Sequence, residues 1–182
     1  LHEYDSPEKL MPSYSTFSRC FYSLMVRPQD MDLKMKEIAM AGFVFMHKDT
    51  AKRFSYIFDK DYFLYGEDFD FCLRIRLQGM KLYTCPKAIM YNMPPSHTAQ
   101  KYISQLRLTY YLERNLLMTY LKICSMNNLL LFFPYVAVMR LATLLRDILR
   151  LQPGVAIARI KSYLWVLFHP RLIYGKRKEI QK

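Results

Sequence analysis

Residues 66–79, GEDFDFCLRIRLQG, have the pattern of a short amphipathic helix. Apolar Phe69, Leu73 and Leu77 recur at four-residue spacing, which places them on one helix face. The acidic residues at the start and the arginines near the end are both stabilised by the helix macrodipole. Gly79 is a typical helix stop, because glycine adopts the left-handed conformation without steric strain. We therefore predict a helix over 66–79.

The acidic residues Glu67, Asp68 and Asp70 have a purely structural explanation. Carboxylates at a helix start accept hydrogen bonds from free backbone N–H groups and meet the positive end of the dipole. Asp70 and Arg74 are also spaced as an i,i+4 ion pair, which on a surface is worth about 0.3–0.5 kcal/mol. A Glu-Asp pair alone is therefore weak evidence for catalysis, and the neighbouring segments have to decide.

The segments around this helix are short. Residues 1–37 lack periodicity and contain three prolines, which predicts loops with short elements. The run 41–47 (AGFVFMH) is typical of a buried strand. The other expected elements are one or two helical turns at 49–54, an irregular segment at 57–65, and short strands at 80–84 and 88–91.

From residue 101 onward the sequence is predicted to be helical. The expected helices are 101–124, 129–151 and 154–168, and a polar basic run, 175–182, ends the chain. Asn127 and Asn128 are expected to separate the first two helices. The longest window without a charge, 123–139, is interrupted by these asparagines and by Pro134, whereas a membrane span needs about 20 apolar residues. A helix pair in the membrane interface is favoured over a full span.

Positive charge is concentrated in this tail. Residues 1–100 hold 13 Lys/Arg against 12 Asp/Glu, whereas residues 101–182 hold 14 against 3, a net charge of +11. The basic residues of the tail are dispersed among aliphatic and aromatic runs, whereas nucleic-acid binders cluster them on a polar face. We therefore expect the tail to bind an anionic membrane surface and no nucleic acid.

The composition is that of a folded protein without a disulfide framework. At 52% hydrophobic and 15% aromatic residues, the chain is too apolar for disorder. Its four cysteines form no C-x-x-C pair, so we expect buried, reduced thiols in a cytosolic setting and no zinc site. The chain starts at Leu1 without a signal-peptide pattern, and we expect residues upstream of it to be missing.

Several motifs surround the acidic helix in a fixed order. In chain order they are residues 11–17 (MPSYSTF), Ala41-Gly42 before an apolar run, Phe58-Asp59, the block 63–74 (FLYGEDFDFCLR), Gly79, Pro86-Lys87-Ala88, and Tyr110-Tyr111-x-x-Arg114-Asn115. This order resembles family 2 glycosyltransferases of the rhamnosyltransferase-like type. The resemblance covers roughly residues 10–120, and the order of many elements makes it more specific than any single motif.

The resemblance implies sugar transfer from a nucleotide-sugar to a glycan or lipid-linked acceptor, with inversion at the anomeric carbon. It assigns the role of catalytic general base to Asp68, since a carboxylate within hydrogen-bond reach can take the proton of the attacking hydroxyl. Glu67 is expected to contact acceptor or donor hydroxyls. The other expected substrate-binding residues are Asp70, Gly42 and Arg114.

Three aromatic residues of the block, Phe63, Tyr65 and Phe69, offer rings for sugar stacking, with an ordinary core role as the alternative.

Two positions depart from the family pattern. The strand after Pro-x-Ala commonly ends in a histidine that helps to bind metal or diphosphate, and the matching residue is Asn92, a poor metal ligand. His97, farther on, is expected to be solvated. Asp30-Met31-Asp32 has the letters of the family's Asp-x-Asp metal motif but lies too close before Gly42, so we interpret it as a solvated loop pair. The implied cofactor, Mg²⁺ or Mn²⁺ on the donor diphosphate, therefore has no ligand expected in this chain.

The expected fold is α/β. Residues 1–100 form the acceptor-side half of a GT-A domain, and residues 101–182 a basic, amphipathic, membrane-associating helical tail. We expect the nucleotide-binding half to lie outside the chain, which would be inactive without it, and we expect the protein at the cytoplasmic face of the membrane, peripheral or monotopic. The alternative is a non-catalytic membrane-associated fragment or partner-binding remnant. The donor sugar, nucleotide, acceptor and linkage stay open.

Overall fold

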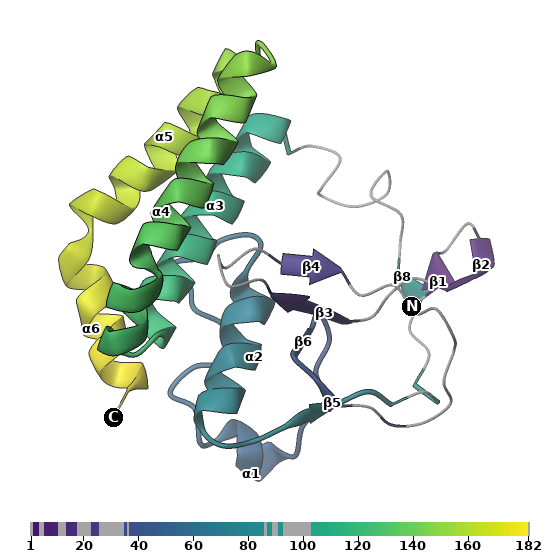
Figure 1. The fold of residues 1–182 in the computed structure, drawn as a ribbon. Coiled ribbons are helices and arrows are strands. Elements are labelled where there is room, and N and C mark those ends of the chain that lie inside the picture. The colour runs from purple at the N-terminus through teal and green to yellow at the C-terminus, as the bar shows by residue number, and fades with distance from the viewer. Residues whose placement is uncertain are drawn as a thin grey trace. The chain divides into compact units, whose positions relative to one another are not determined.

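The computed structural model describes residues 2–3, 6–10, 14–17, 23–25, 35, 37–85, 87–88, 91–92 and 103–181. The chain divides into two compact units, whose elements are labelled in Figure 1. The sheet unit consists of residues 1–16, 23–58 and 68–103, and the helical unit of residues 17–22, 59–67 and 104–182. Helices predominate over small sheets in the described residues, which is compatible with an α/β class.

The described strands of the sheet unit are very short. They are β1 (His2–Glu3), β2 (Ser6–Leu10), β3 (Tyr14–Phe17), β4 (Ser23–Met25), β5 (Glu37–Ile38), β6 (Met40–Ala41), β7 (Leu82–Tyr83) and β8 (Tyr91–Asn92). They form three sheets, ordered β2-β1-β8, β4-β3-β6 and β5-β7. β1 and β8 run parallel, and β1–β2, β3–β6 and β5–β7 pair antiparallel.

The predicted strand over 41–47 is wrong. Only Met40–Ala41 is a strand, and residues 43–47 pair with no strand in the described part of the chain. Phe43 and Phe45 are exposed. An apolar run becomes a strand only where a neighbour accepts its backbone hydrogen bonds, and sequence periodicity does not reveal that neighbour.

The acidic helix is confirmed as α2 (Glu67–Leu77). Its buried apolar residues are Phe69, Phe71, Cys72, Leu73 and Ile75, whereas Leu77 is exposed. Gly79 has φ +74°, the left-handed conformation expected of the stop. The predicted turn near 49–54 is α1 (Lys48–Ala51), whose N-cap is His47: its Nδ1 accepts the Asp49 N–H at 3.3 Å.

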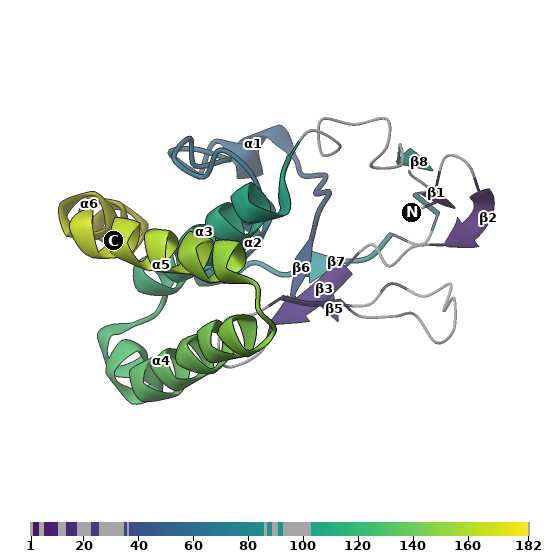
Figure 2. The same cartoon turned by 90° about the horizontal axis from the view of Figure 1, so that it is seen from above.

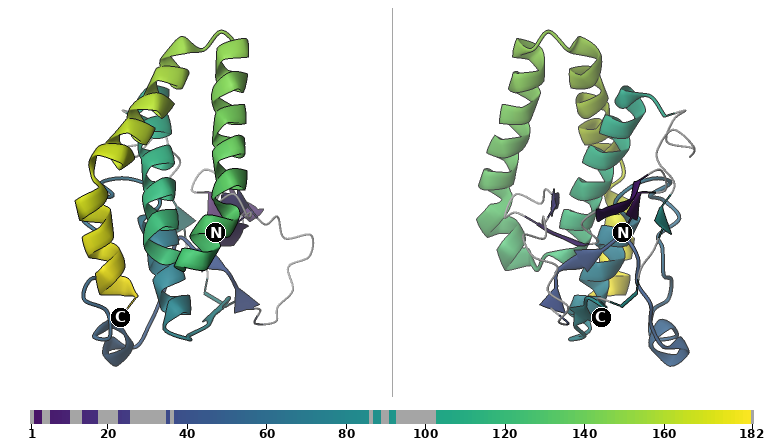
Figure 3. Two further views of the ribbon diagram at one scale, coloured as in Figure 1. Left: turned by 60° about the vertical axis from the view of Figure 1, so that its left-hand side comes forward. Right: turned by 90° about the vertical axis from the view of Figure 1, so that its right-hand side faces the viewer.

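The helical unit contains α3 (Gln105–Ile123), α4 (Met126–Leu149), α5 (Pro153–Phe168) and α6 (Pro170–Ile180). α3 packs against α5 and α6, and α4 packs against α5. Figures 2 and 3 show α4 and α5 as an antiparallel hairpin that turns at residues 150–152. One core cluster joins Tyr62 to residues of α3 and α6, Met118 and Ile173.

Two predictions in this unit are wrong. Asn127 and Asn128 do not break the helices, because Ser125 caps α4: its Oγ accepts the Asn128 N–H at 3.3 Å and starts the helix at Met126. The expectation of three helices is also wrong, since residues 170–180, which include most of the basic run, form a fourth helix, α6. Arg177 and Gln181 donate to backbone carbonyls at the C-terminal end of α3, which lack intrahelical partners.

Candidate active site

Asp68 lies in the first turn of α2, within the sheet unit. Its Oδ1 accepts the backbone N–H of Phe69 at 2.8 Å. Burial raises the pKa of the Asp68 carboxyl above its ordinary value, although the Phe69 N–H acts in the opposite direction. Asp68 is therefore a partly desolvated carboxyl group that holds a proton more tightly than an exposed aspartate.

Gly42 lies directly beside this carboxylate. A Cβ atom built on Gly42 would lie 3.7 Å from Asp68 Oδ2, an ordinary van der Waals distance, and Gly42 itself is exposed. Cys72, one turn further along α2, fixes the neighbouring backbone: its Sγ lies 3.5 Å from both the Ala41 N–H and the Ala41 carbonyl oxygen. Burial raises the pKa of the Cys72 thiol to about 11, so the group stays protonated and structural. The structure thus brings two of the sequence-predicted residues, Gly42 and Asp68, together.

Asp70 is fully buried and pairs with Arg74, whose Nε donates to Asp70 Oδ2 at 2.9 Å. The predicted i,i+4 ion pair is therefore confirmed, but it is buried, whereas a surface pair was expected. The two Nη atoms of Arg74 donate to the carbonyl oxygens of Tyr56 and Ile57 at 2.7 and 2.5 Å. Asp70 therefore anchors the 56–57 segment through Arg74, and its substrate contact stays a prediction.

The loop that precedes α2 has an unusual backbone. Phe63 and Tyr65 have φ +60°, and Gly66 has φ +88°. Left-handed conformations in bulky residues cost about 1–3 kcal/mol each and persist only where surrounding contacts impose them. A Cβ on Gly66 would lie 3.2 Å from the Asn115 Cβ, so glycine is also required for the close approach of α3.

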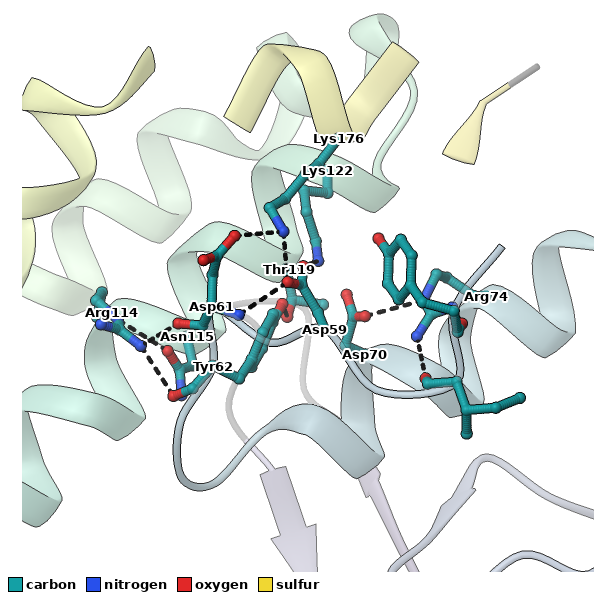
Figure 4. Close-up of polar contacts among 12 residues, drawn as sticks. Asp59, Asp61, Tyr62, Asp70, Arg74, Arg114, Asn115, Thr119, Lys122 and Lys176 are labelled. Atoms are coloured by element: carbon teal, nitrogen blue, oxygen red, sulfur yellow. Dashed lines mark hydrogen bonds and ion pairs between the residues drawn. The ribbon is translucent and has the colours of Figure 1, made fainter. Parts of the chain in front are cut away.

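Asn115 of α3 imposes this conformation. Its side chain is fully buried, and its amide nitrogen donates to the carbonyl oxygens of Tyr62, Leu64 and Tyr65 at 3.0, 2.9 and 2.5 Å. One side chain thus replaces the secondary structure that the loop lacks. Figure 4 shows Asn115 beside Tyr62, and Glu67 and Asp68 follow this loop directly in the sequence.

Arg114 supports the same loop. Its Nη2 donates to the carbonyl oxygens of Asp61 and Tyr62 at 2.6 and 2.9 Å, and its Nε donates to Asn115 Oδ1 at 2.9 Å. Its guanidinium lies 4.8 Å from the ring centroid of Trp165. The geometry gives Arg114 a positioning role, and the predicted substrate contact stays a prediction. The side chains of neighbouring helix residues point about 100° apart. Arg114 and Asn115 nevertheless both reach carbonyl oxygens of residues 61–65.

A buried ion network fastens the start of the loop. Lys122 Nζ lies 2.9 Å from Asp59 Oδ2, and both side chains are almost fully buried. Lys176 of α6 pairs with the other oxygen of Asp59 and, at 2.6 Å, with Asp61 Oδ2. Burial alone would raise the pKa of Asp59, but the two ammonium groups outweigh it and hold that pKa below its usual value. Figure 4 shows this network. Sequence reasoning named only Asp59, as part of the Phe58-Asp59 motif, and missed Asp61, Lys122 and Lys176.

The aromatic residues of the block differ in exposure. Phe63 is 76% exposed and its ring centroid lies 5.1 Å from that of Tyr111, whereas Phe69 is buried in the sheet unit. Phe69 therefore has the core role that was the alternative, and Phe63 is available to a ligand.

No metal site is found in the described part of the chain, where no three His, Cys, Asp or Glu side chains gather. Asp30, Asp32 and His97 lie outside the described residues, and of Asn92 only the backbone, in β8, is described. We therefore derive no step through the Mg²⁺ or Mn²⁺ that the resemblance implies.

The sequence matches no protein-family model and no curated protein, and the fold matches no solved structure.

Proposed function

We propose that the chain is the acceptor side of a family 2 glycosyltransferase of GT-A fold, which transfers a sugar from a nucleotide-sugar to a glycan or lipid-linked acceptor. The observation that carries the proposal is Asp68, a partly desolvated carboxyl group with a raised pKa beside the exposed residue Gly42. Perturbed carboxyl groups of this kind are enriched at catalytic sites. The ordered motifs around it, from Ala41-Gly42 to Arg114-Asn115, supply the resemblance that specifies sugar transfer.

Asp68 acts as the general base in this proposal. The acceptor hydroxyl oxygen forms a bond to the anomeric carbon while the bond from that carbon to the phosphate oxygen breaks. The nucleoside diphosphate leaves with the electron pair, and the hydroxyl proton passes to Asp68. A raised pKa makes the carboxylate a better proton acceptor, because the efficiency of a general base increases as its pKa approaches the working pH.

In the proposal, the other predicted residues bind the substrate or support the loop before α2. Gly42 lets the acceptor approach Asp68 within the sheet unit. The contact of Glu67 with sugar hydroxyls rests on the family resemblance alone. Within the helical unit, Asn115 and Arg114 hold the loop that precedes Glu67 in the sequence. Preorganised supports of this kind matter because small misplacements of catalytic groups reduce rates strongly.

A second candidate function is a non-catalytic membrane-binding module. It is favoured by the apolar side chains that α4 exposes, of which Leu130 is 71% exposed. α4 is also long and apolar enough to cross a membrane by length and composition alone. Both candidate functions imply a protein at the cytoplasmic membrane face, and only the glycosyltransferase is expected to transfer sugar.

The test is a screen of labelled nucleotide-sugars. Membranes from cells that produce this chain in its native context are incubated with each donor and Mg²⁺ or Mn²⁺, and label is measured in the lipid and glycan fractions. We expect transfer from at least one donor, and none with Asp68→Asn. Label transfer that is equal in the wild-type and Asp68→Asn membranes, or absent from both across the panel, would contradict the proposal and leave the membrane-binding module.

A further inference from the structure

The distribution of polarity around α4 is inverted relative to a helix in water. Its inward, buried residues are Val136, Arg140 and Asp147, two of which are charged. Its exposed large apolar side chains are Met126, Leu130, Leu131, Phe133, Tyr135, Val138, Leu141, Leu145, Ile148 and Leu149. Its exposed polar side chains are Asn127 and Asn128 in the first turn and Arg146 near the end. A surface helix of a water-soluble protein turns its apolar stripe inward and its charges outward. The outward face of α4 therefore fits an apolar surrounding.

α5 repeats this arrangement. Its buried residues, Ala156, Ala158, Arg159 and Ser162, are small or polar. Its exposed large side chains are Ile157, Ile160, Leu164, Leu167 and Phe168. Small and polar residues at helix contacts, with large apolar residues outside, are typical of helix pairs in lipid, because lipid supplies no hydrophobic force between the helices.

The inward charges form one buried cluster within the helical unit. Glu113 of α3 pairs with both Arg140 of α4 and Arg159 of α5. Arg159 Nε also donates to Asp147 Oδ2 at 2.6 Å. Ionisable groups in apolar surroundings are tolerated where they face the helix bundle and pair with one another. The cluster therefore connects α4 and α5 to α3 through their buried faces, and the opposite faces of α4 and α5 stay exposed.

The exposed charges of the hairpin have a single sign. Residues 126–168 contain five Lys/Arg and one Asp, and that acid, Asp147, is buried. The exposed charges are Arg146, Arg150 and Lys161. Basic side chains beside an apolar helix face complement a bilayer with anionic headgroups.

We propose that the outward faces of α4 and α5 form a docking surface that lies in the plane of an anionic bilayer, with the apolar side chains at the headgroup boundary. α4, with 24 residues, is about 36 Å long, but α5 has only 16 residues, about 24 Å, and falls short of the hydrocarbon thickness of about 30 Å. The in-plane orientation also leaves Arg146 and Lys161 at the headgroups. This inference specifies the membrane partner of the proposed enzyme but does not depend on sugar transfer.

The test uses the purified chain and sedimentation with phosphatidylcholine vesicles, with and without phosphatidylglycerol. We expect binding at least about tenfold tighter with phosphatidylglycerol, reduced by added salt. The double variant Val138→Asp with Leu141→Asp places charges at side chains that are 62% and 63% exposed, so the fold should survive while binding falls at least about tenfold. The matched control is Tyr174→Asp in α6, which is 68% exposed and should bind like wild type.

Three results would overturn the inference. Equal vesicle binding by the double variant and the Tyr174→Asp control would show that the α4 face does not dock. Resistance of the membrane-bound chain to alkaline carbonate extraction would show that it spans the bilayer and does not lie in its plane. Self-association that the double variant abolishes, without vesicle binding by wild type, would assign the face to a second copy. Sugar transfer in detergent, measured on the same variants, would leave the proposed enzymatic function standing in each case.

Discussion

Asn115→Ala tests whether a single side chain holds the loop that leads to the acidic helix. Two amide hydrogens of Asn115 are shared among three carbonyl oxygens, and Tyr62 O keeps another donor, Arg114 Nη2, when they are removed. The carbonyls of Leu64 and Tyr65 lose the Asn115 donor. A buried polar group that loses its partner costs about 1–3 kcal/mol. Both carbonyls are only part-buried, so we use the lower end of this range for each and expect the free energy of unfolding to fall by about 2 kcal/mol.

Asn115→Ala should also change the local structure of the loop. The Leu64 N–H donates to Tyr62 O at 2.7 Å, and this turn depends on the left-handed conformation of Phe63. Without Asn115, Phe63 and Tyr65 can relax to negative φ, and amide hydrogen exchange in residues 59–66 should accelerate more than in α5. The two readouts are urea denaturation and exchange measured by mass spectrometry.

The control is Asn127→Ala, an asparagine that is exposed in the first turn of α4. It should change stability by less than about 0.5 kcal/mol. If Asn115→Ala lost less than about 1 kcal/mol and left exchange in 59–66 unchanged, the loop conformation would not depend on Asn115 and the reasoning would be refuted.

Two further perturbations test the buried charges. Lys122→Met removes one of the two ammonium groups that pair with the buried Asp59, whereas Lys176 stays, so it should lower the free energy of unfolding by about 1–3 kcal/mol. The exposed control Lys161→Met should change it by less than about 0.5 kcal/mol, and an equally small effect of Lys122→Met would show that the ion network does not stabilise the fold. Asp68→Asn should raise the melting temperature at neutral pH, because the folded-state pKa of Asp68 lies above its unfolded value and its charge therefore destabilises the fold. The higher melting temperature of Asp68→Asn should disappear as the pH falls through the folded-state pKa to below 3.8, because Asp68 is then neutral in both the folded and the unfolded state. If Asp68→Asn instead lowered the melting temperature at neutral pH, Asp68 would be a stabilising helix cap.

Local signals in the sequence were enough to predict α2 and most of the helical unit. The acidic start, the four-residue apolar spacing and Gly79 are all properties of α2 itself, so its bounds came out correctly. The end of α5 before Pro170 follows from proline, and its predicted start at residue 154 lies one residue from the observed start at Pro153. The proximity of Gly42 and Asp68 was expected only through the family resemblance.

The parts that sequence reasoning missed depend on contacts between distant residues. Lys176 and Asp59 are separated by 117 positions in the sequence, and Asn115 is separated from the carbonyls of residues 62–65 by about 50. No local sequence pattern predicts contacts over such separations. Left-handed Phe63 and Tyr65 contradict local preference, because tertiary hydrogen bonds override it. Arg140 of α4 was visible in the sequence, but its inward direction depends on Glu113 of α3.

The central claim is that Asp68 takes the proton of the acceptor in a sugar transfer. The most direct test measures the transfer rate with the donor identified in the screen, for the wild-type protein, Asp68→Asn and the exposed control Asp49→Asn, alongside circular dichroism. Asparagine keeps the shape of Asp68 and can still accept the Phe69 N–H, but it cannot accept the proton. We predict a loss of at least about 10²-fold for Asp68→Asn with an unchanged spectrum, and a normal rate for Asp49→Asn. Near-normal transfer by a folded Asp68→Asn protein would contradict the account.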